Sequence, residues 1–185
     1  MRWILARDWV AAAILLFCWR HYDELRDRHR VRPADWALAV VLGFAVFAAW
    51  IHLDSPYLAF ARAKGFDPWG AGEGMPLALV LRFLAITFVV PVMEELFWRS
   101  FLLRWIDARN FLKLDPHRAS LKALAITSIL FATEHSLWFA GLLAGIAYAG
   151  LYVRTGNLRV PLLSHAVTNG ALATWIVATG NWQFW

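Results

Sequence analysis

The stretch VPVMEELFWRSF, residues 90–101, places two adjacent carboxylates and an arginine inside a run of apolar and aromatic side chains. The surrounding segment from Pro76 to Leu103 is long enough to cross a bilayer as a helix. Ionisable side chains in a hydrocarbon core are costly, so their presence there indicates function. The stretch therefore predicts a membrane-spanning helix that carries a functional site.

The two glutamates of this stretch face different directions, because a helix turns by about 100° per residue. Glu95 and Arg99 stand at i and i+4 with the acid first, which is the favoured order for an ion pair. We therefore expect Glu95 and Arg99 to give structural support and Glu94 to be left without a local partner. The alternative interpretation is a structural ion pair next to one additional glutamate that faces the interior.

The whole chain has the composition of a membrane protein. Of its 185 residues, 61% are hydrophobic and 17% are charged, whereas soluble domains carry about 25% charged residues. The formal net charge is +5, but the basic residues lie in loops between apolar runs, which is typical of membrane orientation and not of nucleic-acid binding. We expect an all-α, polytopic transmembrane helical bundle of about six spans, formed as a single domain over residues 1–185, with the lipid bilayer as a partner and no nucleic acid.

The charge distribution predicts an orientation for this bundle. The loops after the first, third and fifth expected spans hold twelve basic residues, and the other side holds four. Because basic loops stay in the cytoplasm, we expect the chain in the cell (inner) membrane with the active site towards the cytoplasmic side. The expected spans cover residues 9–19, 35–53, 76–103, 115–135, 137–153 and 158–177.

Small residues follow one face of the fifth expected span. Gly141, Gly145 and Ala149 recur at intervals of four residues. Such a face lets two helix backbones approach closely. We therefore expect a tight contact between this helix and a neighbour.

Polar side chains from three expected spans fall at similar depths. By helical rise, Glu94 and His135 lie about 15 and 20 Å from the cytoplasmic ends of their helices, and His165 and Asn169 lie about 9 and 15 Å from theirs. In a core about 30 Å thick, all four are at middle depths. A lone intramembrane histidine is commonly a packing residue, but the convergence of all four predicts one site.

Three motifs in this region also match a family. Residues 94–99 read EExxxR, residues 131–135 read FxxxH, and residues 165–169 read HxxxN. In this order, over about residues 76–177, they resemble the CAAX protease and bacteriocin-processing family, also called the Abi or type II CAAX endopeptidase family. The lead-in VPVM, residues 90–93, more weakly resembles the CAAX protease-related proteins associated with exosortase systems.

The resemblance implies an intramembrane endopeptidase that hydrolyses a peptide bond of a membrane-associated protein or peptide. Glu94 is then the general base, and His135 helps to hold the attacking water. His165 and Asn169 share one helix face and can donate hydrogen bonds to the oxyanion.

A second mechanism uses the same residues. Glu94, His135 and His165 form a plausible catalytic zinc set, with water as the fourth ligand. The sequence does not decide between the two mechanisms. We favour the glutamate mechanism, which needs no cofactor, and assign no metal ligands.

A non-catalytic membrane protein is the competing class. The same fold can serve as a scaffold or an immunity-type protein, or as a proton-coupled carrier with Glu94 and His135 as a relay. Carriers often contain internal repeats, and the sequence shows none. A scaffold would tolerate the loss of Glu94, whereas an enzyme would not.

Overall fold

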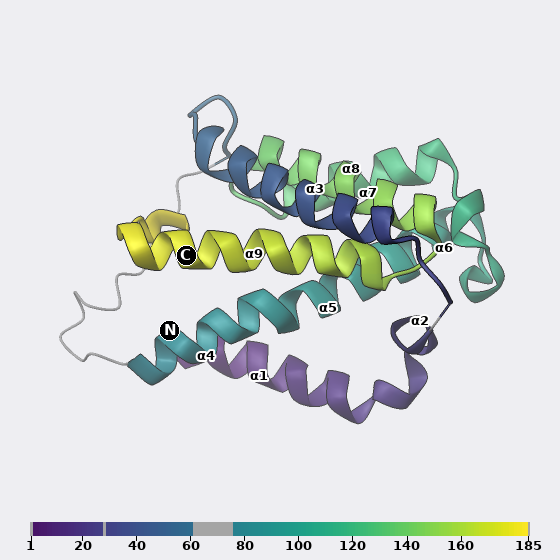
Figure 1. Ribbon diagram of the computed structural model, residues 1–185, viewed down its shortest axis with the longest axis horizontal. Helices are drawn as coiled ribbons and strands as arrows, with labels where there is room; N and C mark the ends of the chain where they lie inside the picture. Colours follow the sequence, from purple (N-terminus) through teal and green to yellow (C-terminus); the bar gives the residue numbers. More distant parts are fainter. Residues whose placement is uncertain (1, 28, 61–75, 185) are drawn as a thin grey trace.

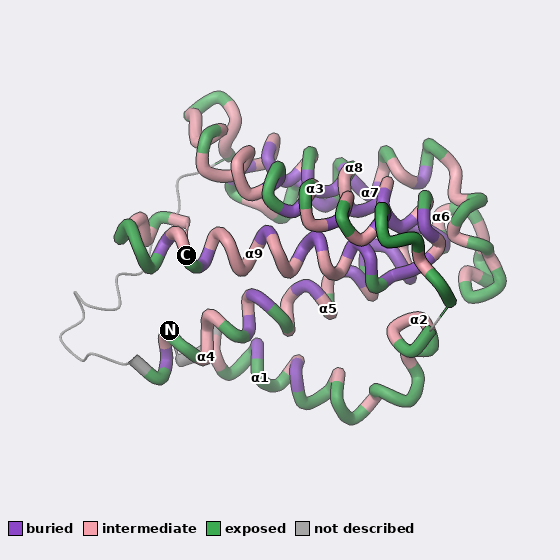
Figure 2. The backbone as a smooth tube through the Cα atoms, viewed as in Figure 1, coloured by how far each residue is buried: buried purple, intermediate pink, exposed green. Residues whose placement is uncertain are grey.

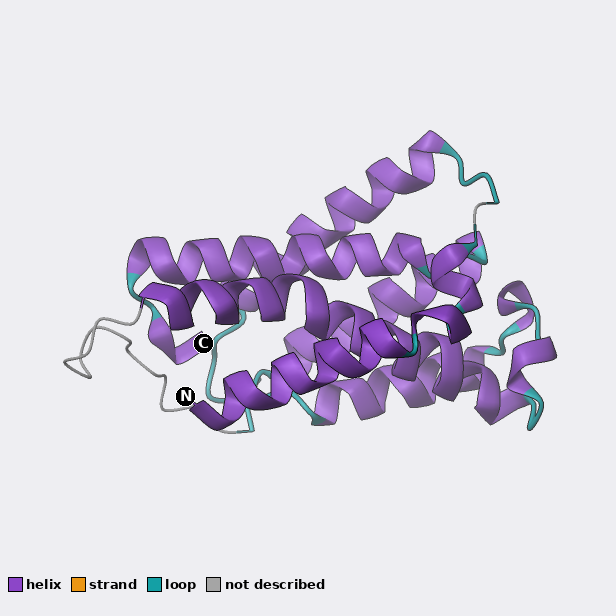
Figure 3. Cartoon of the chain, turned by 90° about the horizontal axis from the view of Figure 1, so that it is seen from below, coloured by secondary structure: helices purple, strands orange, loops and turns teal. Residues whose placement is uncertain are grey.

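A computed structural model describes residues 2–27, 29–60 and 76–184 of the chain. Over these ranges the chain is helical and contains no strand (Figure 3). The longer helices run back and forth along one common axis (Figure 1). The helices are α1 (Arg2–Phe17), α2 (Asp23–Arg26), α3 (Pro33–His52), α4 (Pro76–Leu84), α5 (Val90–Glu95), α6 (Arg104–Asp107), α7 (Leu121–Thr133), α8 (Trp138–Thr155) and α9 (Arg159–Thr179).

Three helical segments of the described chain are long and apolar enough to cross a membrane. They are Pro33–His52, Leu77–Asp107 and Arg159–Thr179. Large apolar side chains such as Phe44 and Phe88 are more than half exposed on the outside of the bundle, as expected for surfaces in contact with lipid. The chain is an integral membrane protein with transmembrane helices.

The expectation of about six spans is not confirmed, because the remaining helices do not reach these criteria. The fourth expected span is the clearest difference. Asp115 caps only a short 3₁₀ turn, Pro116–Arg118. Ser120 then caps α7, whose 13 residues begin at Leu121. This later start makes α7 too short to cross a bilayer of ordinary thickness by itself.

The helix that carries the two glutamates is irregular on both sides of them. A π-helical segment, Ala85–Val89, joins α4 to α5, and a second one, Leu96–Leu103, joins α5 to α6. Pro91 follows the first segment, and its missing N–H cannot bond to the carbonyl one turn earlier. The wider turn accommodates that loss, and π-helical turns are frequent at functional sites.

Close helix contacts hold the interior together. A Cβ added at Gly145 would lie 2.9 Å from Ser128 Cα, and one at Gly141 would lie 3.2 Å from Ala132 Cα. Helices α7 and α8 therefore pack backbone to backbone, which confirms the contact predicted from the small residues. Figure 2 shows buried positions on the inward sides of the helices and exposed positions on the outer sides.

Candidate active site

Four of the predicted site residues line one cavity of about 650 Å³. Glu94 comes from α5, His135 from the turn after α7, and His165 and Asn169 from α9. Residues far apart in the sequence therefore line one cavity. Their depths in the membrane and their catalytic roles stay predictions.

Glu94 presents a carboxylate to this cavity. Its side chain is 20% exposed, and its Oε2 atom lies 3.9 Å from Nε2 of His165. Among the described residues, none forms a hydrogen bond with Oε2, although that atom is buried. A buried polar atom without a protein partner needs an explanation, and binding of a ligand or of water is one.

Glu95 points away from the cavity into the bundle and is fully buried. Its Oε2 lies 3.2 Å from Nε of Arg99, so the expected ion pair is present. Its Oε1 also accepts a hydrogen bond from Nδ1 of His165 at 2.8 Å. Because an ionised carboxylate only accepts, Nδ1 of His165 is assigned the hydrogen and Nε2 is the atom that faces Glu94.

The link between Glu95 and His165 was not found from the sequence. The i, i+4 spacing identified the partner on the same helix, whereas His165 follows 70 residues later on another helix. Two linked motifs thus form one unit, in which Glu95 orients the imidazole of His165. Such outer partners commonly fix the tautomer and direction of a functional histidine.

Aromatic rings surround the buried ion pair. The guanidinium carbon of Arg99 lies 4.6 Å from the ring centroid of Phe131 and 5.3 Å from that of Tyr148. Tyr148 also stacks on His165 at 4.7 Å and donates a hydrogen bond to Thr168 Oγ1 at 2.8 Å. These contacts stabilise a desolvated cation and restrict the rotation of His165.

His135 is held by the backbone of the preceding helical turn. Its Nδ1 lies 2.7 Å from the carbonyl oxygen of Phe131, so Nδ1 donates and Nε2 is left as an acceptor. Trp50 contacts the ring edge-on at 5.3 Å. The FxxxH spacing therefore has a physical basis, because one helical turn places the Phe131 carbonyl under the imidazole.

Asn169 connects α9 to the first π-helical segment. Its Nδ2 donates a hydrogen bond to the carbonyl oxygen of Ile86 at 2.8 Å. The second hydrogen of this amide is left for another acceptor. The side chain can therefore position the irregular helix and donate to a substrate.

The choice between the glutamate mechanism and the zinc alternative stays a prediction. Within residues 2–27, 29–60 and 76–184, no three His, Cys, Asp or Glu side chains converge closely enough to hold a metal ion. Glu94, His135 and His165 share the cavity without forming such a group.

The cavity reaches the end of the bundle that lies opposite the basic loops. Its lining includes Asp54, Ser136 and Gln183, and the expected orientation of the active site towards the cytoplasmic side stays a prediction. These residues follow the C-terminal ends of α3, α7 and α9, which lie together at the end where the chain also terminates (Figure 1).

The family described as type II CAAX prenyl endopeptidase Rce1-like matches residues 76–171, which is just over half of the chain. The chain belongs to the Rce1-like type II CAAX prenyl endopeptidase family. All three motifs and the four predicted site residues that line the cavity fall inside the matched range. No curated protein and no solved structure matches the chain.

The Rce1-like family consists of CAAX-type proteases that act on membrane-associated proteins within membranes, so membership implies a protease. The three spanning segments agree with this location. The weaker likeness of residues 90–93 to exosortase-associated proteins stays a prediction.

Proposed function

We propose that this chain is a glutamate-dependent intramembrane endopeptidase of the cell (inner) membrane that cleaves a membrane-associated protein or peptide. The observation that carries the proposal is the buried Oε2 of Glu94, which has no hydrogen-bond partner among the described residues and lies in a cavity beside His165.

Glu94 takes a proton from water, and the resulting hydroxide attacks the carbonyl carbon of the scissile bond. His135 accepts a hydrogen bond from this water through Nε2 and so orients it. The carboxylic acid formed on Glu94 then gives its proton to the departing amine as the C–N bond breaks. The products are a new carboxyl terminus and a new amino terminus.

Asn169 and His165 stabilise the oxyanion that forms in the first step. The free amide hydrogen of Asn169 and, in the imidazolium form, the Nε2–H of His165 are the donors. Glu95 orients the imidazole of His165, since its Oε1 lies 2.8 Å from Nδ1. Arg99 holds Glu95 in place through a contact of 3.2 Å.

Replacement of the proposed base tests the function. Glu94→Gln keeps the size and polarity of the side chain but removes the base, so we expect cleavage to fall by at least about a hundredfold. The measurement is mass spectrometry of new peptide termini in membranes from cells that express the wild type or the variant. Asp23→Asn serves as the matched control, because that carboxylate is 92% exposed and does not line the cavity.

Normal cleavage by well-folded Glu94→Gln protein would exclude Glu94 as the base. If the same peptide termini are found in membranes with and without the wild-type chain, the scaffold or carrier alternative is favoured. Activity that is lost on chelation and regained with zinc would overturn the metal-free mechanism.

A further inference from the structure

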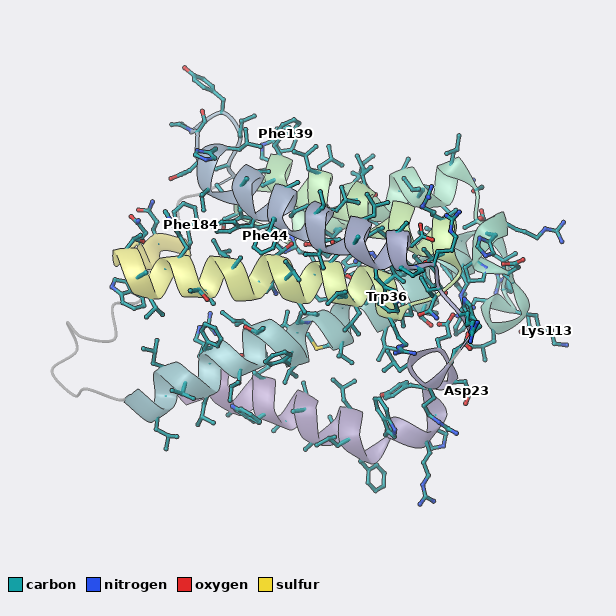
Figure 4. All side chains as sticks on the ribbon, in the orientation of Figure 1. Asp23, Trp36, Phe44, Lys113, Phe139 and Phe184 are labelled. Carbon is teal, nitrogen blue, oxygen red and sulfur yellow. The ribbon has the colours of Figure 1, made fainter. Side chains whose placement is uncertain are left out.

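The exposed residues that line the cavity show at which end of the bundle it opens. Arg7, Glu134 and Gln183 are exposed residues that line it. They lie near the start of α1, in the turn between α7 and α8, and after α9. Phe184, which also lines the cavity, is labelled at the same end in Figure 4, whereas Lys113 and Asp23 are labelled at the other end. The mouth is therefore at the end that carries the C-terminus.

The opposite end of the bundle is filled by packed side chains. Leu103, Tyr152 and Leu158 belong to one core cluster and are essentially inaccessible. Beyond them Glu24 accepts hydrogen bonds from Tyr152 at 2.6 Å and from Arg104 at 3.1 Å. None of these five residues lines the cavity. A substrate therefore has no path to Glu94 from this end through the described side chains.

The filled end is also the basic end of the chain. The arginines and lysines there come from the loops around α2, between α6 and α7, and between α8 and α9. They are Arg20, Arg26, Arg30, Arg32, Arg104, Arg109, Lys113, Arg118, Lys122, Arg154 and Arg159. Basic flanks of membrane helices stay on the cytoplasmic side. The cavity mouth then lies on the side away from the cytoplasm.

We propose that the substrate enters from the non-cytoplasmic face, and that it is a polypeptide segment at the outer membrane boundary and not a cytoplasmic C-terminus. This inference rests on the proposed protease function. The scissile bond reaches Glu94 from the side on which Asp54 and Gln183 lie, and the water for hydrolysis enters by the same route.

The lining of the cavity suits a segment that passes from lipid to water. Its wall includes the apolar side chains of Ile86, Val90, Leu172 and Ile176. Its mouth is polar and carries both signs of charge, from Arg7, Asp54, Arg82 and Glu134. A cavity with an apolar wall and a mouth of both charge signs favours a substrate in which an apolar stretch is followed by polar residues. The mouth has no strong preference for the charge of these polar residues.

Cysteine labelling tests the direction of entry without requiring activity. In a Cys18→Ala background, single cysteines are introduced as Gln183→Cys at the mouth and Lys113→Cys at the filled end. A membrane-impermeant disulfonated stilbene maleimide is applied to intact spheroplasts and to everted vesicles. We expect Gln183→Cys to react in spheroplasts and Lys113→Cys to react only in everted vesicles. The reverse pattern would overturn the inference, because the mouth would then face the cytoplasm.

The positions of new peptide termini provide the second measurement. Termini that depend on Glu94 should map to the outer boundary of membrane proteins or to the segment outside it. Glu94-dependent termini in cytoplasmic segments would contradict the inference even though the protease function stands. If no Glu94-dependent termini form, the protease function fails, whereas the labelling pattern still reports which face carries the mouth.

Discussion

The replacement Glu95→Gln separates the supporting glutamate from the proposed base. Glu95 is fully buried and has two partners, Arg99 at 3.2 Å and His165 at 2.8 Å. The variant leaves the cation of Arg99 in a desolvated site, and breaking a buried ion pair costs about 3–5 kcal/mol. In a chain of this size, each kcal/mol of lost stability lowers the melting temperature by about 2–4 °C, so we expect the variant to melt about 6–20 °C below the wild type.

Arg99→Met provides the matched test of this reasoning. In the double variant Glu95→Gln with Arg99→Met no lone charge remains, and Met retains apolar contact with Phe131 and Tyr148. We expect the double variant to melt at a higher temperature than Glu95→Gln alone. Its cleavage should stay low, because the neutral amide of a glutamine accepts a weaker hydrogen bond from Nδ1 of His165 than a carboxylate does and so orients the ring less firmly.

The measurements are a melting curve in detergent and the yield of new peptide termini for each variant. Glu94→Gln should melt close to the wild type, since its Oε2 has no hydrogen-bond partner among the described residues. A Glu95→Gln protein that melts like the wild type would refute the energetic argument. Full cleavage by the double variant would refute the role of Glu95 in orienting His165.

Two further predictions concern packing and pH. Gly145→Ala places a Cβ 2.9 Å from Ser128 Cα, so it should destabilise the bundle by about 1–3 kcal/mol in a detergent melt. The Cβ of Gly150→Ala meets nothing within 4 Å, so this variant should be neutral or stabilising by up to about 1 kcal/mol. Equal melting temperatures of the two variants would contradict this prediction. Outside the spanning segments, the hydrogen bond from His29 to Asp27 raises the pKa of His29 above 6.5, so its stabilising effect is complete below about pH 6.5 and is lost as the pH rises through the raised value. The difference in melting temperature between wild type and His29→Ala should accordingly narrow with rising pH. A difference that does not change with pH would exclude a stabilising effect of the contact between His29 and Asp27.

The sequence alone determined the class of the protein and indicated four side chains that line one cavity. Apolar runs interrupted by basic loops predicted an all-helical membrane protein, because only satisfied backbones can cross a bilayer. The spacing from Glu94 to Arg99 and the polar residues at middle depth predicted which side chains share the cavity. These inferences depend on periodicity within one helix and on composition, and both can be read from a single chain.

The tertiary structure decided the contacts between helices and the direction of the cavity. The bond from His165 to Glu95 joins helices 70 residues apart, and no local spacing specifies such a pair. The cap at Ser120 starts α7 at Leu121, six residues later than the start expected at Asp115, and this makes the helix only 13 residues long. Helix ends depend on capping and on packing against neighbours. Asp115 and Ser120 are both suitable caps, and in the structure Asp115 caps only a short 3₁₀ turn. The cavity therefore opens at the end opposite the basic loops, because the side chains that fill the basic end come from several helices that meet only in the folded chain.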